Sequence, residues 1–184
     1  MTELLCNPEA LSKTRMELEQ TIGKGNQIEE SDITRLPYLQ AVVKETFRLH
    51  PAAPLLLPRK ASTNTQVAGY TIPKDALVLV NVWAIGRDEG LRENPCSFMP
   101  ERFLGSEIDV KGRNFELIPF GAGRRICPGL PLAIRMLYLM LGSLINSFDW
   151  KFEDGITQHN MDMEEKFGLT LQKAQPLHAI PIAI

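Results

Sequence analysis

The chain has 184 residues, of which 44% are apolar and 23% charged, and its formal net charge is −2. This is the composition of an ordinary globular domain with a core of its own, and no basic excess points to nucleic-acid binding. The three cysteines include no C-x-x-C pair, which argues against a zinc site and against a disulfide framework.

Helices are predicted for most of the first 50 residues. The start of the chain, Met1 to Leu5, has the pattern of the middle of a helix. Residues 7–23 form the next helix, with an asparagine cap, a proline in its first turn and a glycine at its end. A short helical turn begins at Ser31, and residues 37–50 form a second major helix that is stopped by Pro51.

The pattern then changes from helical to extended. Short alternating segments separated by Gly69 and by a Pro-Lys-Asp turn predict strands at residues 55–57, 66–68, 70–72 and 77–80. A small helix is expected at residues 82–87. Residues 89–119 show little periodicity and predict a long ordered meander.

The last long helix is predicted at residues 130–147. It is apolar on nearly every side, so we expect it to be buried. Its most apolar stretch, 136–145, is shorter than the about 20 residues that cross a bilayer, and the first residues lack the pattern of a signal peptide. Short closing strands are expected around Trp150, Phe152 and residues 169–171. The predicted fold class is mainly α with small β-sheets.

The segment from Phe120 to Gly129 carries the strongest chemical signal. It places Cys127 in a glycine-rich turn, two residues after Arg125 and just before the long apolar helix. Helix-end amides and a nearby cation favour a thiolate, the form of sulfur that binds metals. Glycines let the backbone approach a flat ligand. The alternative is a tight turn with a buried structural cysteine.

The pattern F-x-x-G-x-R-x-C-x-G resembles the haem-binding loop of cytochromes P450, with Phe120, Gly123, Arg125, Cys127 and Gly129 at its fixed positions. The resemblance implies that Cys127 binds the iron of haem b as a thiolate. It also implies that the glycines let the loop lie beneath the porphyrin and that Arg125 contacts a propionate. Phe120 would shield the sulfur, although a simple core aromatic remains an alternative for it.

Two further segments resemble signatures of the same family. They are E-x-x-R, with Glu45 and Arg48, and P-E-R-F, with Arg102. The resemblance implies that these three side chains form a buried ion triad behind the haem, which would hold the cysteine loop in place. Taken alone, Glu45 and Arg48 would form a solvated helical pair and Arg102 would be an exposed turn residue.

Family positions also indicate residues around the cofactor and the substrate. Arg59 matches a second propionate-contacting position, with a surface arginine as the alternative. Two apolar segments match substrate-lining positions, with ordinary core packing as the alternative; they contain Ala53, Pro54 and Leu55, and Phe167, Gly168 and Leu169. The histidines His50, His159 and His178 are expected to be structural or exposed.

Within the family, residues 36–45 and 161–168 resemble plant enzymes of the geraniol 8-hydroxylase kind. The resemblance implies a monooxygenase that inserts one oxygen atom from O₂ into a small hydrophobic substrate, such as the monoterpenoid alcohol geraniol. It also implies electrons from NADPH–cytochrome P450 reductase and a location on the cytosolic face of the endoplasmic reticulum membrane.

The resemblance further implies that residues 1–184 are the C-terminal, haem-binding portion of one P450 domain. The family's N-terminal membrane anchor and oxygen-activating helix have no counterpart in these residues. A truncated remnant without catalytic activity is therefore an alternative, and so is a haem-thiolate isomerase or dehydratase.

Two residues depart from the family pattern. Glu89 and Arg92 stand where the family usually has proline and tryptophan. Loss of the aromatic side chain is expected to cost about 3 kcal/mol of packing if the site is buried.

Overall fold

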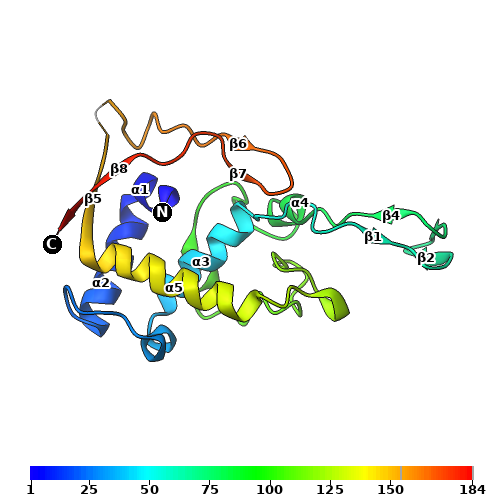
Figure 1. Cartoon of the computed structure of the whole chain (residues 1–184), viewed down its shortest axis with the longest axis horizontal. Coiled ribbons are helices and arrows are strands. Elements are labelled where there is room, and N and C mark those ends of the chain that lie inside the picture. Colours follow the sequence, from blue (N-terminus) through cyan, green and yellow to red (C-terminus); the bar gives the residue numbers. More distant parts are fainter. Residues whose placement is uncertain (154, 184) are drawn as a thin grey trace.

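The main hydrophobic core of the molecule lies in its helical part. The computed structural model describes residues 1–153 and 155–183, and Figure 1 shows the long helices lying against one another. The helices and helical turns are α1 (Thr2–Cys6), α2 (Pro8–Thr21), η1 (Glu30–Arg35), α3 (Pro37–Leu49), α4 (Val82–Gly86), η2 (Pro100–Phe103), η3 (Gly123–Arg125) and α5 (Leu130–Ser147).

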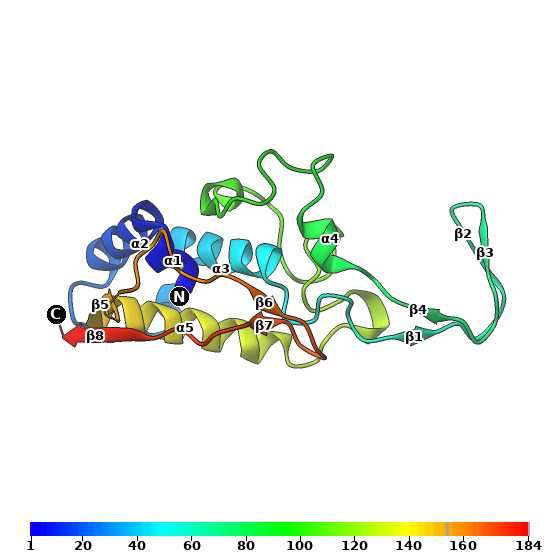
Figure 2. The same cartoon turned by 90° about the horizontal axis from the view of Figure 1, so that it is seen from above.

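The described strands pair as short antiparallel two-stranded sheets. The pairs are β1 (Arg59–Lys60) with β4 (Leu77–Val78), β2 (Thr65–Val67) with β3 (Tyr70–Ile72), β5 (Phe148–Phe152) with β8 (Ala179–Ala183), and β6 (Glu165–Lys166) with β7 (Gln172–Lys173). Figures 1 and 2 show the β1–β4 and β2–β3 ribbons extending away from the helices, whereas β6 and β7 run back beside them.

The main core lies between α2, α3 and α5, and Leu4 of α1 belongs to it. Its fully buried members include Leu4, Leu18, Leu39 and Ile145. Gly142 lets α5 approach closely, because a Cβ atom there would lie 2.8 Å from Cδ1 of Ile28 and 3.2 Å from Cδ2 of Leu39. The helical spacing of apolar residues thus packs α2 and α5 against α3.

A second cluster attaches the long meander to α3. It contains Ala41, Phe103, Val110 and Leu117, and Phe120 packs against it. The meander is therefore ordered by apolar contacts despite having few regular elements, and it delivers the segment that follows to one side of α3.

The structure corrects two of the strand predictions. Residues 55–57 form a turn, in which Leu56 has φ 52° and its backbone NH donates to the carbonyl of Ala53 at 3.0 Å. Pairing with β4 begins only at Arg59. Residues 169–171 lie in the loop of the β6–β7 hairpin, whose strands flank them. In both segments apolar residues occupy a turn, which apolar runs alone do not reveal.

The expected burial of α5 is also wrong. Only 22% of its residues are buried, among them Tyr138, Gly142 and Ile145. By length and composition α5 could cross a membrane, but its packing against α2, α3 and η1 makes it a core helix with one covered side. The other side is apolar and exposed, and includes Leu132, Met136 and Met140.

Candidate cofactor site around Cys127

The cysteine loop is held in shape by its own backbone hydrogen bonds. The NH of Cys127 donates to the carbonyl of Phe120 at 3.0 Å, and the NH of Ile126 donates to the carbonyl of Gly123 at 3.1 Å. Gly121 and Gly123 have φ values of +74° and +68°, which favour glycine. The sequence therefore folds this segment into a tight loop that ends at Gly129, the residue that caps α5.

Cys127 is exposed, and this is not the buried structural cysteine of the alternative. A Cβ atom at Gly129 would lie 3.7 Å from its Sγ atom, while a Cβ atom at Gly123 would meet no atom within 4 Å. The loop thus presents its sulfur beside open space, and a flat group has room to approach it.

Two arginines lie in or against the loop. The Nη2 atom of Arg59, which is half-buried, donates to the carbonyl of Ala122 at 3.4 Å, so β1 places this guanidinium on the loop. Arg125 belongs to the loop itself and is exposed. A ligand with carboxylates at its rim would find charge-assisted donors there.

Phe120 faces the protein more than the solvent. Its ring packs edge-on against Phe47, with ring centroids 5.2 Å apart and an interplanar angle of 71°. Phe120 is half-buried in the second cluster, so the structure gives it a packing role and also ties the cysteine loop to α3.

The donor set around Cys127 suits a ligand that brings its own metal ligands. In residues 1–153 and 155–183, no group of three or more His, Cys, Asp or Glu side chains could hold a metal ion. A metal bound by Cys127 alone would need its other ligands from elsewhere, and a porphyrin supplies four nitrogens. The exposed thiol, the open space at Gly123 and the two guanidiniums therefore fit a haem.

Glu45 and Arg48 of α3 and Arg102 of η2 lie together. Arg48 donates to Glu45 through Nε and Nη2, both at 2.7 Å, and Nε of Arg102 donates to Oε1 of Glu45 at 3.0 Å. The side chains of Glu45 and Arg48 are 0% exposed and that of Arg102 is 15% exposed. The backbone NH of Met99 also donates to Glu45, at 2.8 Å. Both carboxylate oxygens of Glu45 thus have charge-assisted donors in this buried place.

The same arginines tie α3 to the meander. Nη1 of Arg48 donates to the carbonyl of Gly86 at 2.6 Å, and Nη2 donates to that of Ser97 at 3.0 Å. Gly86 must be small, because a Cβ atom there would lie 2.3 Å from the carbonyl oxygen of Arg48. One buried ion group thus fixes α4, η2 and the meander relative to α3.

Arg92 takes part in this arrangement, which the sequence did not reveal. Its Nη1 donates to the carbonyl of Ile85 at 3.1 Å and its Nη2 to that of Glu116 at 2.7 Å. Burial, and then the charge of Arg48, lower the pKa of Arg92. The half-buried guanidinium joins α4 to the meander, so the expected packing defect is replaced by polar contacts, whereas Glu89 is exposed.

The two segments expected to line a substrate pocket lie side by side. The backbone NH of Leu171 donates to the carbonyl of Ala52 at 2.8 Å, which attaches the β6–β7 hairpin to the turn after α3. In that turn Pro54 is buried, and Ala53 and Leu55 are half-buried. At the hairpin tip Phe167 and Leu169 are 65% and 87% exposed, and Gly168 between them is also exposed.

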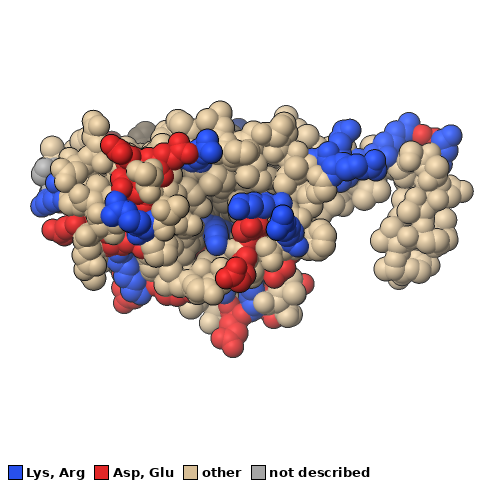
Figure 3. Space-filling model, turned by 90° about the horizontal axis from the view of Figure 1, so that it is seen from below, with Lys and Arg blue, Asp and Glu red and all other residues tan. Residues whose placement is uncertain are grey.

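The charges on the surface are mixed. Figure 3 shows acidic and basic side chains interspersed over one face of the helical body, and basic side chains also along the protruding ribbon. This face carries no large patch of a single sign, in keeping with the net charge of −2.

Comparisons with known proteins agree with this geometry. The cytochrome P450 family model matches residues 1–178. Geraniol 8-hydroxylase of Swertia mussotii is 61% identical over 180 residues, which are 98% of this chain and 36% of that enzyme. Cytochrome P450 76T24 of Catharanthus roseus is 62% identical over 184 residues, 100% of this chain and 37% of that protein.

Solved structures give the same result. A zebra fish cytochrome P450 in a structure with abiraterone superposes with a TM-score of 0.86 at 32% sequence identity, covering 98% of this chain and 41% of the other. The predicted fold class, mainly α with small β-sheets as part of a P450 fold, is thereby confirmed. The chain spans a little over a third of the length of the curated relatives that it matches, and the family implies a haem-iron cofactor. Through matches over nearly its whole length, the chain belongs to the cytochrome P450 family.

Proposed function

We propose that residues 1–184 are the C-terminal, haem-binding portion of a plant P450 monooxygenase. The reaction would insert one oxygen atom from O₂ into a small hydrophobic substrate, a monoterpenoid alcohol such as geraniol. The observation that carries the proposal is the exposed sulfur of Cys127 in a tight loop beside open space. The 61% identity to the geraniol 8-hydroxylase of Swertia mussotii supports the substrate class.

Each site residue then has a definite task. A thiolate-ligated haem supplies the cleavage of the O–O bond when it is bound. Cys127 would hold the iron, Gly123 and Gly129 would keep backbone and side-chain atoms away from the ring, and Arg59 and Arg125 would pair with the propionates. Phe120, packed on Phe47, would keep water from the protein side of the loop.

Behind the loop, the triad of Glu45, Arg48 and Arg102 would keep it rigid through its bonds to the meander. The hairpin tip and the turn after α3 would supply an apolar wall for the substrate. They include Ala53, Pro54, Leu55, Phe167, Gly168 and Leu169.

The family implies a redox partner, and we propose NADPH–cytochrome P450 reductase. We place the protein on the cytosolic face of the endoplasmic reticulum membrane, with attachment through an N-terminal anchor of the kind carried by plant members of the family. Mixed surface charge at a net charge of −2 accords with a protein partner and gives no support for nucleic acid.

Haem titration of the purified chain tests the cofactor assignment. We expect one haem per chain, with loss of the thiolate signature in Cys127→Ala. The matched control is Cys96→Ala, because Cys96 is also an exposed thiol but lies in the meander. Haem binding by Cys127→Ala with the thiolate signature retained would contradict the assignment.

Activity is best tested in a complete enzyme. In a chimera, residues 1–184 replace the matching segment of the Swertia mussotii geraniol 8-hydroxylase. We expect this chimera to hydroxylate geraniol when reductase and NADPH are supplied. A chimera that binds haem through its cysteine and leaves geraniol unchanged would overturn the proposed substrate while keeping the haem assignment.

A remnant without activity is the second candidate, and the observation that favours it is the 36% coverage of the relatives. Failure of the isolated chain to hold haem, together with an active chimera, would show that these residues function only within a longer protein. A chimera that shows the thiolate signature but consumes neither O₂ nor NADPH would favour the isomerase or dehydratase alternative.

A further inference from the structure

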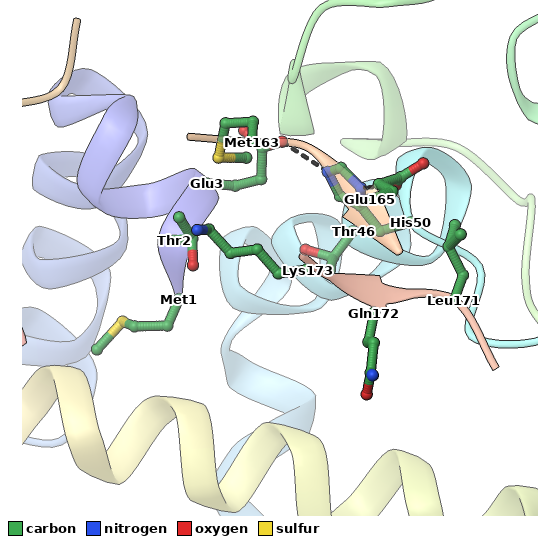
Figure 4. Close-up of a pocket in the computed structure, with 10 residues that line it drawn as sticks. All are labelled: Met1, Thr2, Glu3, Thr46, His50, Met163, Glu165, Leu171, Gln172 and Lys173. Atoms are coloured by element: carbon green, nitrogen blue, oxygen red, sulfur yellow. Dashed lines mark hydrogen bonds and ion pairs between the residues drawn. The ribbon is translucent and has the colours of Figure 1, made fainter. Parts of the chain in front are cut away.

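His50 joins three segments that are far apart in the sequence. It caps the C-terminal end of α3. Its Nδ1 atom lies 2.5 Å from Oε1 of Glu165 in β6, and its Nε2 atom lies 2.7 Å from Oε1 of Glu3 in α1. Figure 4 shows the imidazole between the two carboxylates, at the side of a cavity of about 200 Å³.

This geometry requires a particular protonation state. An ionised carboxylate only accepts hydrogen bonds, and a neutral imidazole has one NH group, so only an imidazolium donates to both Glu3 and Glu165. The imidazole is 28% exposed, which leaves the two contacts partly shielded from water. Burial would lower the pKa of His50, but the hydrogen bonds to Glu3 and Glu165 outweigh it and raise the pKa above its ordinary value.

Glu165 is also held from a second side, by α4. The Nε1 atom of Trp83 donates to Oε2 of Glu165 at 3.1 Å, and Nη2 of Arg87 lies 3.8 Å from Oε1. The guanidinium of Arg87 stacks over the Trp83 ring, 4.1 Å from its centroid. Glu165 is thus the point at which the hairpin meets both α3 and α4.

The remaining charges near His50 are few. Lys173 of β7 and Met1, which carries the amino group of the chain, line the same cavity. Neither is in hydrogen-bond contact with the imidazole among the described residues, whereas Glu3 and Glu165 are. Glu3 and Glu165 are therefore the main groups that stabilise the charge of His50.

The base of the hairpin is fixed while its tip is free. Glu165, the first residue of β6, pairs with Lys173, the last residue of β7, and the backbone NH of Leu171 donates to the carbonyl of Ala52. Phe167 and Leu169, at the tip, are exposed. The direction of the tip therefore depends on the contacts at the base, of which the one between His50 and Glu165 involves a titratable cation.

We propose that the His50 imidazolium bridges Glu3 and Glu165 and so holds the β6–β7 hairpin against the ends of α3 and α1. In this role His50 is a positioning group that determines the positions of Phe167 and Leu169 at the hairpin tip. The bridge itself stands on the geometry alone. Its consequence for substrate selection rests on the proposed function.

The stabilisation by the His50 bridge depends on pH in a defined way. A raised pKa in the folded state means that the stabilisation is fully present below the ordinary histidine pKa of about 6.5 and is lost as the pH rises through the folded-state pKa. A neutral His50 has only one NH group, so one of the two carboxylates faces an unprotonated ring nitrogen and loses its hydrogen bond.

Hydrogen exchange of the hairpin amides tests the bridge on the chain as it is. After correction for intrinsic exchange rates, we expect protection of residues 165–173 to fall about tenfold as the pH rises through the His50 titration. In His50→Gln, protection should be low and independent of pH. In His50→Arg, which keeps a cation that does not titrate, protection should stay high across the range.

His178→Gln is the matched control, because His178 is exposed and 3.7 Å from a single glutamate, Glu153. It should leave the profile unchanged. An unchanged pH dependence in His50→Gln would overturn the bridge. An NMR titration of His50 in the wild type serves if that variant does not fold: a midpoint at or below about 6.5 would also overturn the proposal.

The link to substrate is tested separately in the haem-loaded chimera. With Glu165→Gln we expect KM for geraniol to rise and the ratio of oxidation products to change, with the haem spectrum unaltered. If hairpin protection follows His50 but KM and product ratio do not respond, the bridge stands and the substrate-lining role of the hairpin falls.

Discussion

The Glu45 triad and the Cys127 loop lie on the same scaffold but have opposite surroundings. Glu45 and Arg48 are fully buried, and their charged atoms are bonded to each other and to backbone carbonyls. Cys127 and Arg125 are exposed. The two sets therefore find their partners in different places. The triad finds them within the chain and stabilises the fold, whereas the loop offers its functional atoms to something outside the chain.

The largest effect is expected from breaking the triad. Glu45→Gln removes the anion between Arg48 and Arg102 and should cost about 3–5 kcal/mol in the free energy of unfolding, because a buried charge is left uncompensated. Urea denaturation measures it, with Glu9→Gln, an exposed glutamate on α2, as the control. A loss below about 1 kcal/mol would show that the triad does not stabilise the fold.

A second way to break the buried side is to crowd it. Gly86→Ala places a Cβ atom 2.3 Å from the carbonyl oxygen of Arg48 and should destabilise the chain by about 1–3 kcal/mol. At Gly168 the nearest atom would be 3.5 Å away, so Gly168→Ala is the control. Equal stability of the two variants in the same denaturation would mean that α4 is not pressed against α3.

Arg92 tests the edge of the buried region. Arg92→Ala removes donors to the carbonyls of Ile85 and Glu116 and should cost about 1–2 kcal/mol, less than Glu45→Gln because the group is only half-buried. Thermal unfolding can resolve this difference. Arg124→Ala, at an exposed position in the loop, should leave the melting temperature unchanged. If Arg92→Ala left the melting temperature unchanged, apolar packing alone would hold α4 against the meander.

The smallest effect on stability is expected at the cysteine. Cys127→Ser in the haem-free chain should change the unfolding free energy by less than about 0.5 kcal/mol, because the side chain is exposed. A loss of several kcal/mol in the haem-free state would place Cys127 with the structural residues and remove the contrast between the two regions.

The sequence predicted best where residue spacing dictates geometry. Spacing of three placed Glu45 and Arg48 on one helix face, and proline and glycine marked the ends of α2 and α3. Turns rich in leucine were misread as strands, since apolar content does not reveal the positive φ of Leu56. The exposure of Leu132 and Met140 on α5 was missed for a related reason, because apolarity does not tell which side has a partner.

Long-range polar contacts could not be predicted from the sequence. Glu3 and Glu165 lie 47 and 115 residues from His50, and no local pattern links them. The guanidinium of Arg92 likewise reaches a carbonyl 24 residues away. Such contacts are set by how the meander and the hairpin fold back on α3, and this becomes visible only in three dimensions.

The role of Cys127 as iron ligand is tested most directly by the carbon monoxide difference spectrum of the reduced, haem-loaded chain, compared between the wild type and Cys127→Ser. We expect the red-shifted absorption of a thiolate-ligated haem in the wild type and its absence in the variant, with both proteins equally stable before haem is added. Survival of the red-shifted band in Cys127→Ser would contradict the assignment of this sulfur as the iron ligand.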